Sequence, residues 1–124
     1  MDRIFLGIGA ILGFLGVALG AFAAHGLKQR LPAEMLIVFE TGVRYHMYHA
    51  LALLAVGLTV ARGPSAALVA AGWLFLAGIA IFSGSLYALA ISGVRTLGMI
   101  TPLGGVAFLA GWIAFAVGAF SGPR

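Results

Sequence analysis

The feature that most constrains this chain is a series of four long apolar runs, separated by single charged residues or short polar stretches. The runs cover residues 4–27, 45–61, 63–94 and 96–123. A helix needs about 20 apolar residues to cross the hydrocarbon core of a bilayer. Inside lipid the backbone must satisfy its own hydrogen bonds, which favours helices over other structures. The runs therefore predict membrane-spanning helices.

The composition argues against a water-soluble fold. Of the 124 residues, 63% are hydrophobic and 8% are charged, whereas a soluble domain carries about 25% charged residues. We expect a single all-α membrane domain over residues 1–124. Its four transmembrane helices are predicted at about residues 4–25, 43–61, 66–91 and 102–121. Residues 32–41 are expected to form an interfacial segment, a loop, or an extension of the second helix.

Turn and capping residues mark the ends of these helices. Ser65 is expected to cap the third helix, and Thr101 to cap the fourth ahead of Pro102. Gly93 is expected to end the third helix. Residues 62–64 are expected to form a tight turn between the second and third helices.

The charged residues and the lack of cysteine narrow the function classes. The chain has a net charge of +4 and seven basic residues. These lie near the ends of the apolar runs, as is typical of side chains that flank a membrane and not of a basic face that binds nucleic acid. We therefore expect membrane lipids as partners and no nucleic acid. Without cysteine, the chain has no disulfide, thiolate metal site or cysteine nucleophile.

Glycines recur at helical spacing and predict close helix packing. Small residues let helix backbones approach each other in lipid, where little hydrophobic force holds helices together. Both contacts within one chain and contacts in a homo-oligomer fit this pattern. The glycines assigned to packing are Gly9, Gly13, Gly16, Gly20, Gly78, Gly104, Gly111 and Gly118.

The distinctive polar residues are expected to gather at one face of the membrane, where the first and third helices end and the second and fourth begin. Glu40 and Arg44 have the i, i+4 spacing of a helical ion pair. His49 lies deepest in the second helix and needs a partner, which the third helix is expected to supply. The candidate functional residues are His25, Glu40, Arg44, Tyr45, His46, His49, Ser83, Ser85, Tyr87 and Thr101.

The histidines also allow a metal-site hypothesis. His46 and His49 with His25 or Glu40 offer metal-binding atoms, but the spacing is weak evidence. A hydrogen-bonded structural histidine is the favoured interpretation of His49. We therefore expect no metal and no cofactor, and we find no nucleophile–base motif of a hydrolase.

Five strings resemble the YgdD-like family of small bacterial membrane proteins of unknown function. They are GAFAAHGL at 20–27, FETGVRYHMYHALA at 39–52, FSGSLY at 82–87, TPLGG at 101–105 and FLAGW at 108–112. They occur in order over nearly the whole chain. The resemblance implies a four-helix inner-membrane protein with both termini in the cytoplasm. It implies no reaction.

Three function classes remain open. The favoured one is a structural, interaction or lipid-binding helical bundle without enzyme activity. The second is a small channel or transporter whose entrance is lined by the His/Tyr/Ser cluster. The third is an intramembrane metal site or enzyme that uses His25, His46 and His49.

Overall fold

The computed structural model describes residues 1–122, which fold into four long helical rods. Their segments are α1 (Asp2–Phe22) with η1 (Ala23–Leu27), then α2 (Ala33–Arg62), then α3 (Ala66–Gly78) with η2 (Ile79–Ser83) and α4 (Gly84–Ser92), and finally η3 (Arg95–Met99) with α5 (Thr101–Ser121). The four expected helices are therefore confirmed. Short π-helical turns in η1 and η2 interrupt the first and third rods without ending them.

The second rod begins ten residues earlier than residue 43, so residues 32–41 are mostly the N-terminal extension of α2. Met35 and Phe39 lie one turn apart on this extension and are both buried. They pack in a cluster with Ala23, Leu27 and Ala90, which belong to the first and third rods. Residues 33–42 extend α2 as a helix because its apolar side is buried between the first and third rods.

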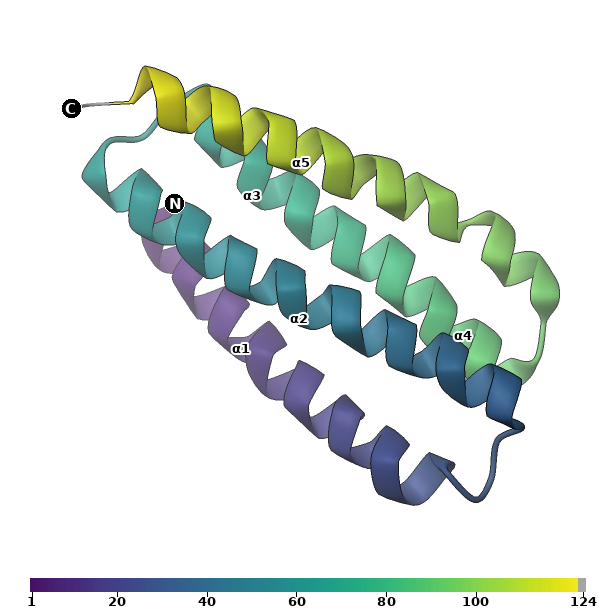
Figure 1. The fold of residues 1–124 in the computed structure, drawn as a ribbon. Coiled ribbons are helices and arrows are strands. Elements are labelled where there is room, and N and C mark those ends of the chain that lie inside the picture. The colour runs from purple at the N-terminus through teal and green to yellow at the C-terminus, as the bar shows by residue number, and fades with distance from the viewer. Residues whose placement is uncertain (123–124) are drawn as a thin grey trace.

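Neighbouring rods run antiparallel (Figure 1). α2 packs against α1 on one side and against α3, η2 and α4 on the other. α5 packs against α3 and η2 and has little contact with α2. The N-terminus, the α2–α3 turn and the end of α5 lie at one end of the bundle, and the other two connections lie at the opposite end. This arrangement leaves a gap in the packing between α2 and α5.

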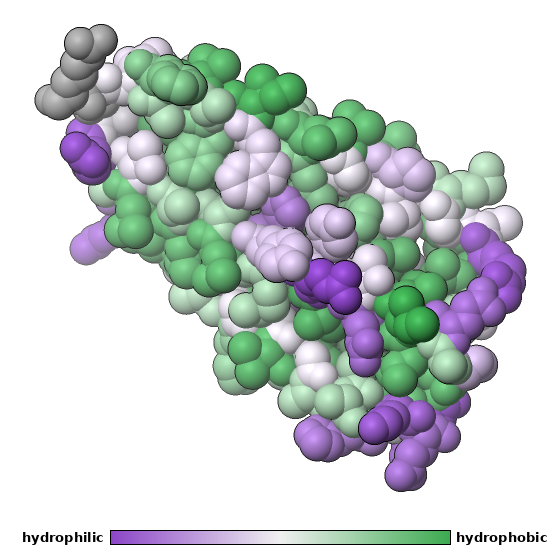
Figure 2. Space-filling model, viewed as in Figure 1, coloured by the Kyte–Doolittle hydropathy of each residue, from purple (hydrophilic) through white to green (hydrophobic). Residues whose placement is uncertain are grey.

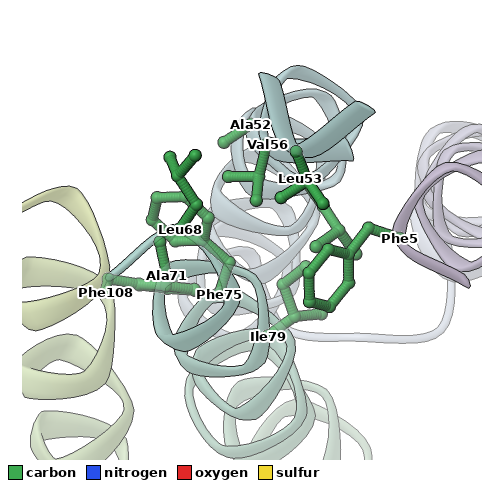
Figure 3. Packing of buried hydrophobic residues seen from close by; sticks show 10 residues of the cluster. Phe5, Ala52, Leu53, Val56, Leu68, Ala71, Phe75, Ile79 and Phe108 are labelled. Carbon is green, nitrogen blue, oxygen red and sulfur yellow. The ribbon is translucent and has the colours of Figure 1, made fainter. Parts of the chain in front are cut away.

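The main apolar core draws residues from all four rods, with Phe108 as its buried member from α5 (Figure 3). Phe5 of α1 is fully buried in this cluster, and a Cβ added at Gly72 of α3 would meet its ring. Its ring also packs edge-to-face on Trp73 at a centroid distance of 5.4 Å. These contacts join α1 to the third rod, although α2 lies between the two rods over most of their length.

Most of the predicted packing glycines lie at close helix contacts. A Cβ at Gly9 would lie 2.9 Å from Leu54 Cδ2, and one at Gly104 would lie 2.7 Å from the Cα of Phe82. Added Cβ atoms would also meet neighbouring side chains at Gly16, Gly20, Gly78, Gly111 and Gly118. Gly13 differs, because nothing lies within 4 Å of its Cβ position. The pattern missed close contacts at Gly42, Gly57 and Gly72.

Two of the three predicted helix ends are confirmed. Ser65 Oγ accepts a hydrogen bond from the Leu68 N–H at 3.2 Å, and Gly93 ends α4 with a left-handed φ of 73°. The predicted cap at Thr101 is wrong. Ile100 already has helical backbone angles, so Thr101 lies inside the first turn of α5 and does not cap it.

Three of the four rods are long and apolar enough to cross a membrane: Asp2–Leu27, Ala66–Ser92 and Arg95–Ser121. Their outer faces carry large exposed apolar side chains such as Phe14 and Phe120. α2 is not among these spans. It carries Glu34, Glu40 and Arg44 along with two histidines and two tyrosines, which lower its apolar character.

Candidate functional site

His46 and His49 are both buried in α2, with exposed fractions of 3% and 4%, but they point to different neighbours. His46 faces α1 and α4, where its Nε2 lies 2.8 Å from the Leu12 carbonyl and its Nδ1 lies 2.8 Å from the Tyr87 hydroxyl. A carbonyl can only accept, so Nε2 carries the proton and Nδ1 accepts from Tyr87. Because a charged ring is costly to bury, His46 is neutral, and it joins three rods.

His49 has the opposite arrangement and faces α5. Its Nδ1–H donates to the Tyr45 carbonyl at 2.7 Å, and its Nε2 accepts from the indole N–H of Trp112 at 3.1 Å. The ring also stacks on Phe108 with centroids 3.6 Å apart and planes at 9°. Both nitrogens are thus satisfied by a neutral ring.

The prediction that the third rod supplies a hydrogen-bond partner for His49 is wrong. Tyr87 bonds to His46 and not to His49, and Ser83 Oγ donates to the Gly42 carbonyl at 2.7 Å. Ser85 bonds to Thr101 at 2.5 Å, which ties α4 to the start of α5. The prediction fails because the His49 side chain lies on the side of α2 that faces α5. Sequence reasoning missed Trp112, although an indole N–H in a membrane helix needs an acceptor at the same depth.

The charged members of the predicted cluster stand apart from these buried bonds. His25, Glu40 and Arg44 are exposed. The predicted ion pair between Glu40 and Arg44 is absent from the described residues, where Arg95 instead pairs with Glu34 at 3.2 Å. The cluster is therefore a buried network with a separate charged rim.

The metal-site hypothesis finds no geometry in its favour. Within residues 1–122, no three His, Asp or Glu side chains come together in a way that could hold a metal ion. His46 and His49 point to different rods, and their ring nitrogens are already bonded. His25 and Glu40 are exposed elsewhere.

The gap between α2 and α5 forms a groove with a volume of about 580 Å³. We call it the α2/α5 groove. The exposed fractions of Leu109 and Val106 on its α5 wall are 67% and 62%. The hydrogen-bonded rings of His49 and Trp112 lie against it. Its lining residues are Tyr45, Tyr48, His49, Phe82, Pro102, Gly105, Val106, Phe108, Leu109 and Trp112.

The groove lies beside a polar strip on an otherwise apolar surface. Figure 2 shows hydrophilic residues running along the middle of this face over α2, with hydrophobic residues on both sides. Tyr45 and Tyr48 are both exposed at the groove and pack edge-to-face, with centroids 5.8 Å apart. The groove is therefore apolar and aromatic, with two tyrosines in its α2 wall.

Comparisons with known proteins give consistent similarities. Residues 19–105 match a family described as "Protein of unknown function (DUF423)". The chain is 49% identical over 118 residues to the UPF0382 membrane protein YwdK of Bacillus subtilis, covering 94% of this chain and 96% of that one. It is 42% identical over 118 residues to the UPF0382 inner membrane protein YgdD of Escherichia coli, covering 95% and 90%. No solved structure matches this one.

Proposed function

We propose that this chain, which belongs to the DUF423 family, is a four-span membrane bundle that binds the hydrocarbon chain of a lipid in the α2/α5 groove. An inner-membrane location fits both its apolar helices and the name of its relative YgdD. The single observation that carries the proposal is an aromatic groove open along its side to the surroundings of the bundle.

The arrangement of the rods supports α2 as the fourth span. The first rod ends at one end of the bundle, and the third begins at the other (Figure 1). If both cross a membrane, the chain between them must return across it. The polar rings of His46 and His49 do not oppose this path, because their nitrogens are hydrogen-bonded inside the bundle.

The size and surface of the groove suit an alkyl chain. Ligand pockets commonly have volumes of about 300–1,000 Å³, and this groove has about 580 Å³. Its wall residues Val106 and Leu109 face the surrounding hydrocarbon. At this depth of the membrane, acyl chains are the abundant apolar molecules. They reach the groove without leaving the bilayer.

The hydrogen bonds of the groove floor favour an apolar ligand over a transported ion. Because Trp112 and His49 bond to each other, and His49 Nδ1 bonds to the Tyr45 carbonyl, neither side chain offers a free polar atom to the groove. The bundle beyond them is filled by the apolar cluster around Phe75 and Leu53. A channel through this region therefore has less support than a lipid site.

Filling the groove tests the proposal. Gly105 lies in its wall, and a Cβ there meets only Phe82 Cδ2 at 4.0 Å, so Gly105→Phe projects a ring into the groove. The matched control is Gly7→Phe, because nothing lies within 4 Å of the Gly7 Cβ position. Native mass spectrometry of purified protein counts the lipids that each variant retains.

We expect the wild type and Gly7→Phe to retain a lipid that Gly105→Phe loses, with similar thermal unfolding for all three. Equal lipid retention by Gly105→Phe and the wild type would overturn the proposal. A dimer that Gly105→Phe alone disrupts would assign the groove to a second copy of the chain.

A further inference from the structure

We infer that the lipid in the α2/α5 groove is an anionic phospholipid whose phosphate is held by Arg44 beside the hydroxyl of Tyr48. This inference rests on the proposed function, because it names the headgroup of a lipid whose chain lies in the groove. The observation behind it is an exposed arginine, Arg44, that pairs with no acidic group of residues 1–122 and lies one helical turn from a residue that lines the groove.

Arg44 lies at the depth where a lipid phosphate is expected. Arg62 marks the opposite end of α2, eighteen residues further along the helix. At 1.5 Å per residue the two arginines are about 27 Å apart along the axis. The hydrocarbon core of a bilayer is about 30 Å thick. The two guanidinium groups therefore lie near its two boundaries.

Arg44 is also next to the groove. On a helix surface, side chains four residues apart are neighbours, so Arg44 lies above Tyr48 on the rim of the α2 wall. The exposed fraction of Tyr48 is 54%, and its hydroxyl makes no hydrogen bond to residues 1–122. A phosphate at this point meets a guanidinium fork, whose donors match its oxygens in pairs, and a phenolic donor.

The charges around the rim favour an anionic ligand. Glu40 makes no ion pair with Arg44, and Glu34 is engaged with Arg95 at 3.2 Å. This end of the bundle carries four basic side chains, Lys28, Arg30, Arg44 and Arg95, against two acidic ones, Glu34 and Glu40. A net negative lipid complements this balance better than a zwitterionic one, and Arg44 directly precedes the groove residue Tyr45 in α2.

Lipid competition in nanodiscs tests the inference. Phosphatidylglycerol and phosphatidylcholine with identical acyl chains are mixed in equal amounts, and native mass spectrometry measures which lipid stays bound after release from the disc. The variant is Arg44→Gln. The matched control is Arg30→Gln, which removes one positive charge from the same end of the bundle but from the exposed α1–α2 connection.

We expect the wild type and Arg30→Gln to retain phosphatidylglycerol preferentially. Arg44→Gln should lower the ratio of bound phosphatidylglycerol to phosphatidylcholine about tenfold, as loss of one charge-assisted contact implies. Its total bound lipid should change little, because the groove is intact. Equal losses in both variants would overturn the inference in favour of diffuse attraction to the bundle.

The inference and the proposed function fail in different ways. Retention of both lipids without preference by the wild type would overturn the role of Arg44 and leave the groove as a chain-binding site. Loss of all lipid from the wild type would overturn the proposed function itself.

Discussion

The indole N–H of Trp112 donates to Nε2 of His49 across 3.1 Å and joins α2 to α5, two helices that otherwise have little contact. The bond requires a neutral His49, because Nδ1 donates its proton to the Tyr45 carbonyl. His46, one turn earlier, uses its nitrogens in the opposite order. Two histidines with different tautomers thus connect α2 to different neighbours.

Trp112→Phe is expected to destabilise the bundle by about 1 kcal/mol, because it leaves the Nε2 acceptor of His49 unpaired. A buried acceptor left unpaired in a protein core costs about 1–3 kcal/mol. Side-chain hydrogen bonds between membrane helices average about 0.6 kcal/mol, so the lower part of that range applies. Reversible unfolding in mixed detergent micelles measures the change in the free energy of unfolding.

Trp73→Phe is the control for the loss of an indole. Trp73 packs on Phe5 and makes no side-chain hydrogen bond to residues 1–122. A double-mutant cycle of Trp112→Phe with His49→Phe should show coupling, because these two residues share the bond. Absence of coupling would mean that the bond contributes nothing to stability.

Tyr87→Phe is expected to destabilise the protein by roughly 0.5–1.5 kcal/mol, because it removes the donor to His46 Nδ1. Tyr45→Phe removes a hydroxyl that has no hydrogen bond within the described chain, so it should change stability little. The same unfolding assay compares the two. Similar losses from both would show that the Tyr87–His46 bond is not important for the fold.

Gly104→Ala is expected to destabilise the contact between α5 and the third rod by at least 1 kcal/mol, as overpacking typically does. The added methyl group meets the backbone of Phe82, which cannot rotate away as a side chain could. Gly13→Ala is the matched control, because its Cβ position is open and alanine favours the helix. The melting temperatures should therefore move in opposite directions. A drop for Gly13→Ala equal to that of Gly104→Ala would contradict this account.

The helices and several of their ends were predictable because they depend on local features. The four helices follow from the apolar runs. Ser65 caps α3 by accepting a hydrogen bond from the N–H of Leu68, three residues later, and Gly93 ends α4 because its own φ is left-handed. The resemblance to YgdD-like proteins, based on consecutive strings, is confirmed by the family match. The prediction that Thr101 caps α5 was wrong because Ile100 already has helical backbone angles. The spacing of residues in the sequence does not reveal those angles.

The site was harder to predict because it depends on which way each helix turns. His49 was expected to find its partner on the third helix, whereas its Nε2 accepts from Trp112 of α5 and Tyr87 bonds to His46. No sequence pattern predicted the α2/α5 groove. Its α5 wall consists of residues such as Val106 and Leu109, which resemble any lipid-facing side chain. Only the loose packing between α2 and α5 makes them the wall of a groove.

The lack of cysteine makes the four-span topology directly testable. Single cysteines at Gln29, Pro64 and Ser121 all lie on exposed surface near the ends of rods. A membrane-impermeant maleimide applied to intact cells should label Gln29→Cys on one side, whereas Pro64→Cys and Ser121→Cys should react only after the membrane is opened, or the reverse. The reason is that α2 separates Gln29 from Pro64, and the third and fourth rods return Ser121 to the side of Pro64. Labelling of Gln29→Cys and Pro64→Cys from the same side would show that α2 does not cross the membrane, and a four-span bundle would then be wrong.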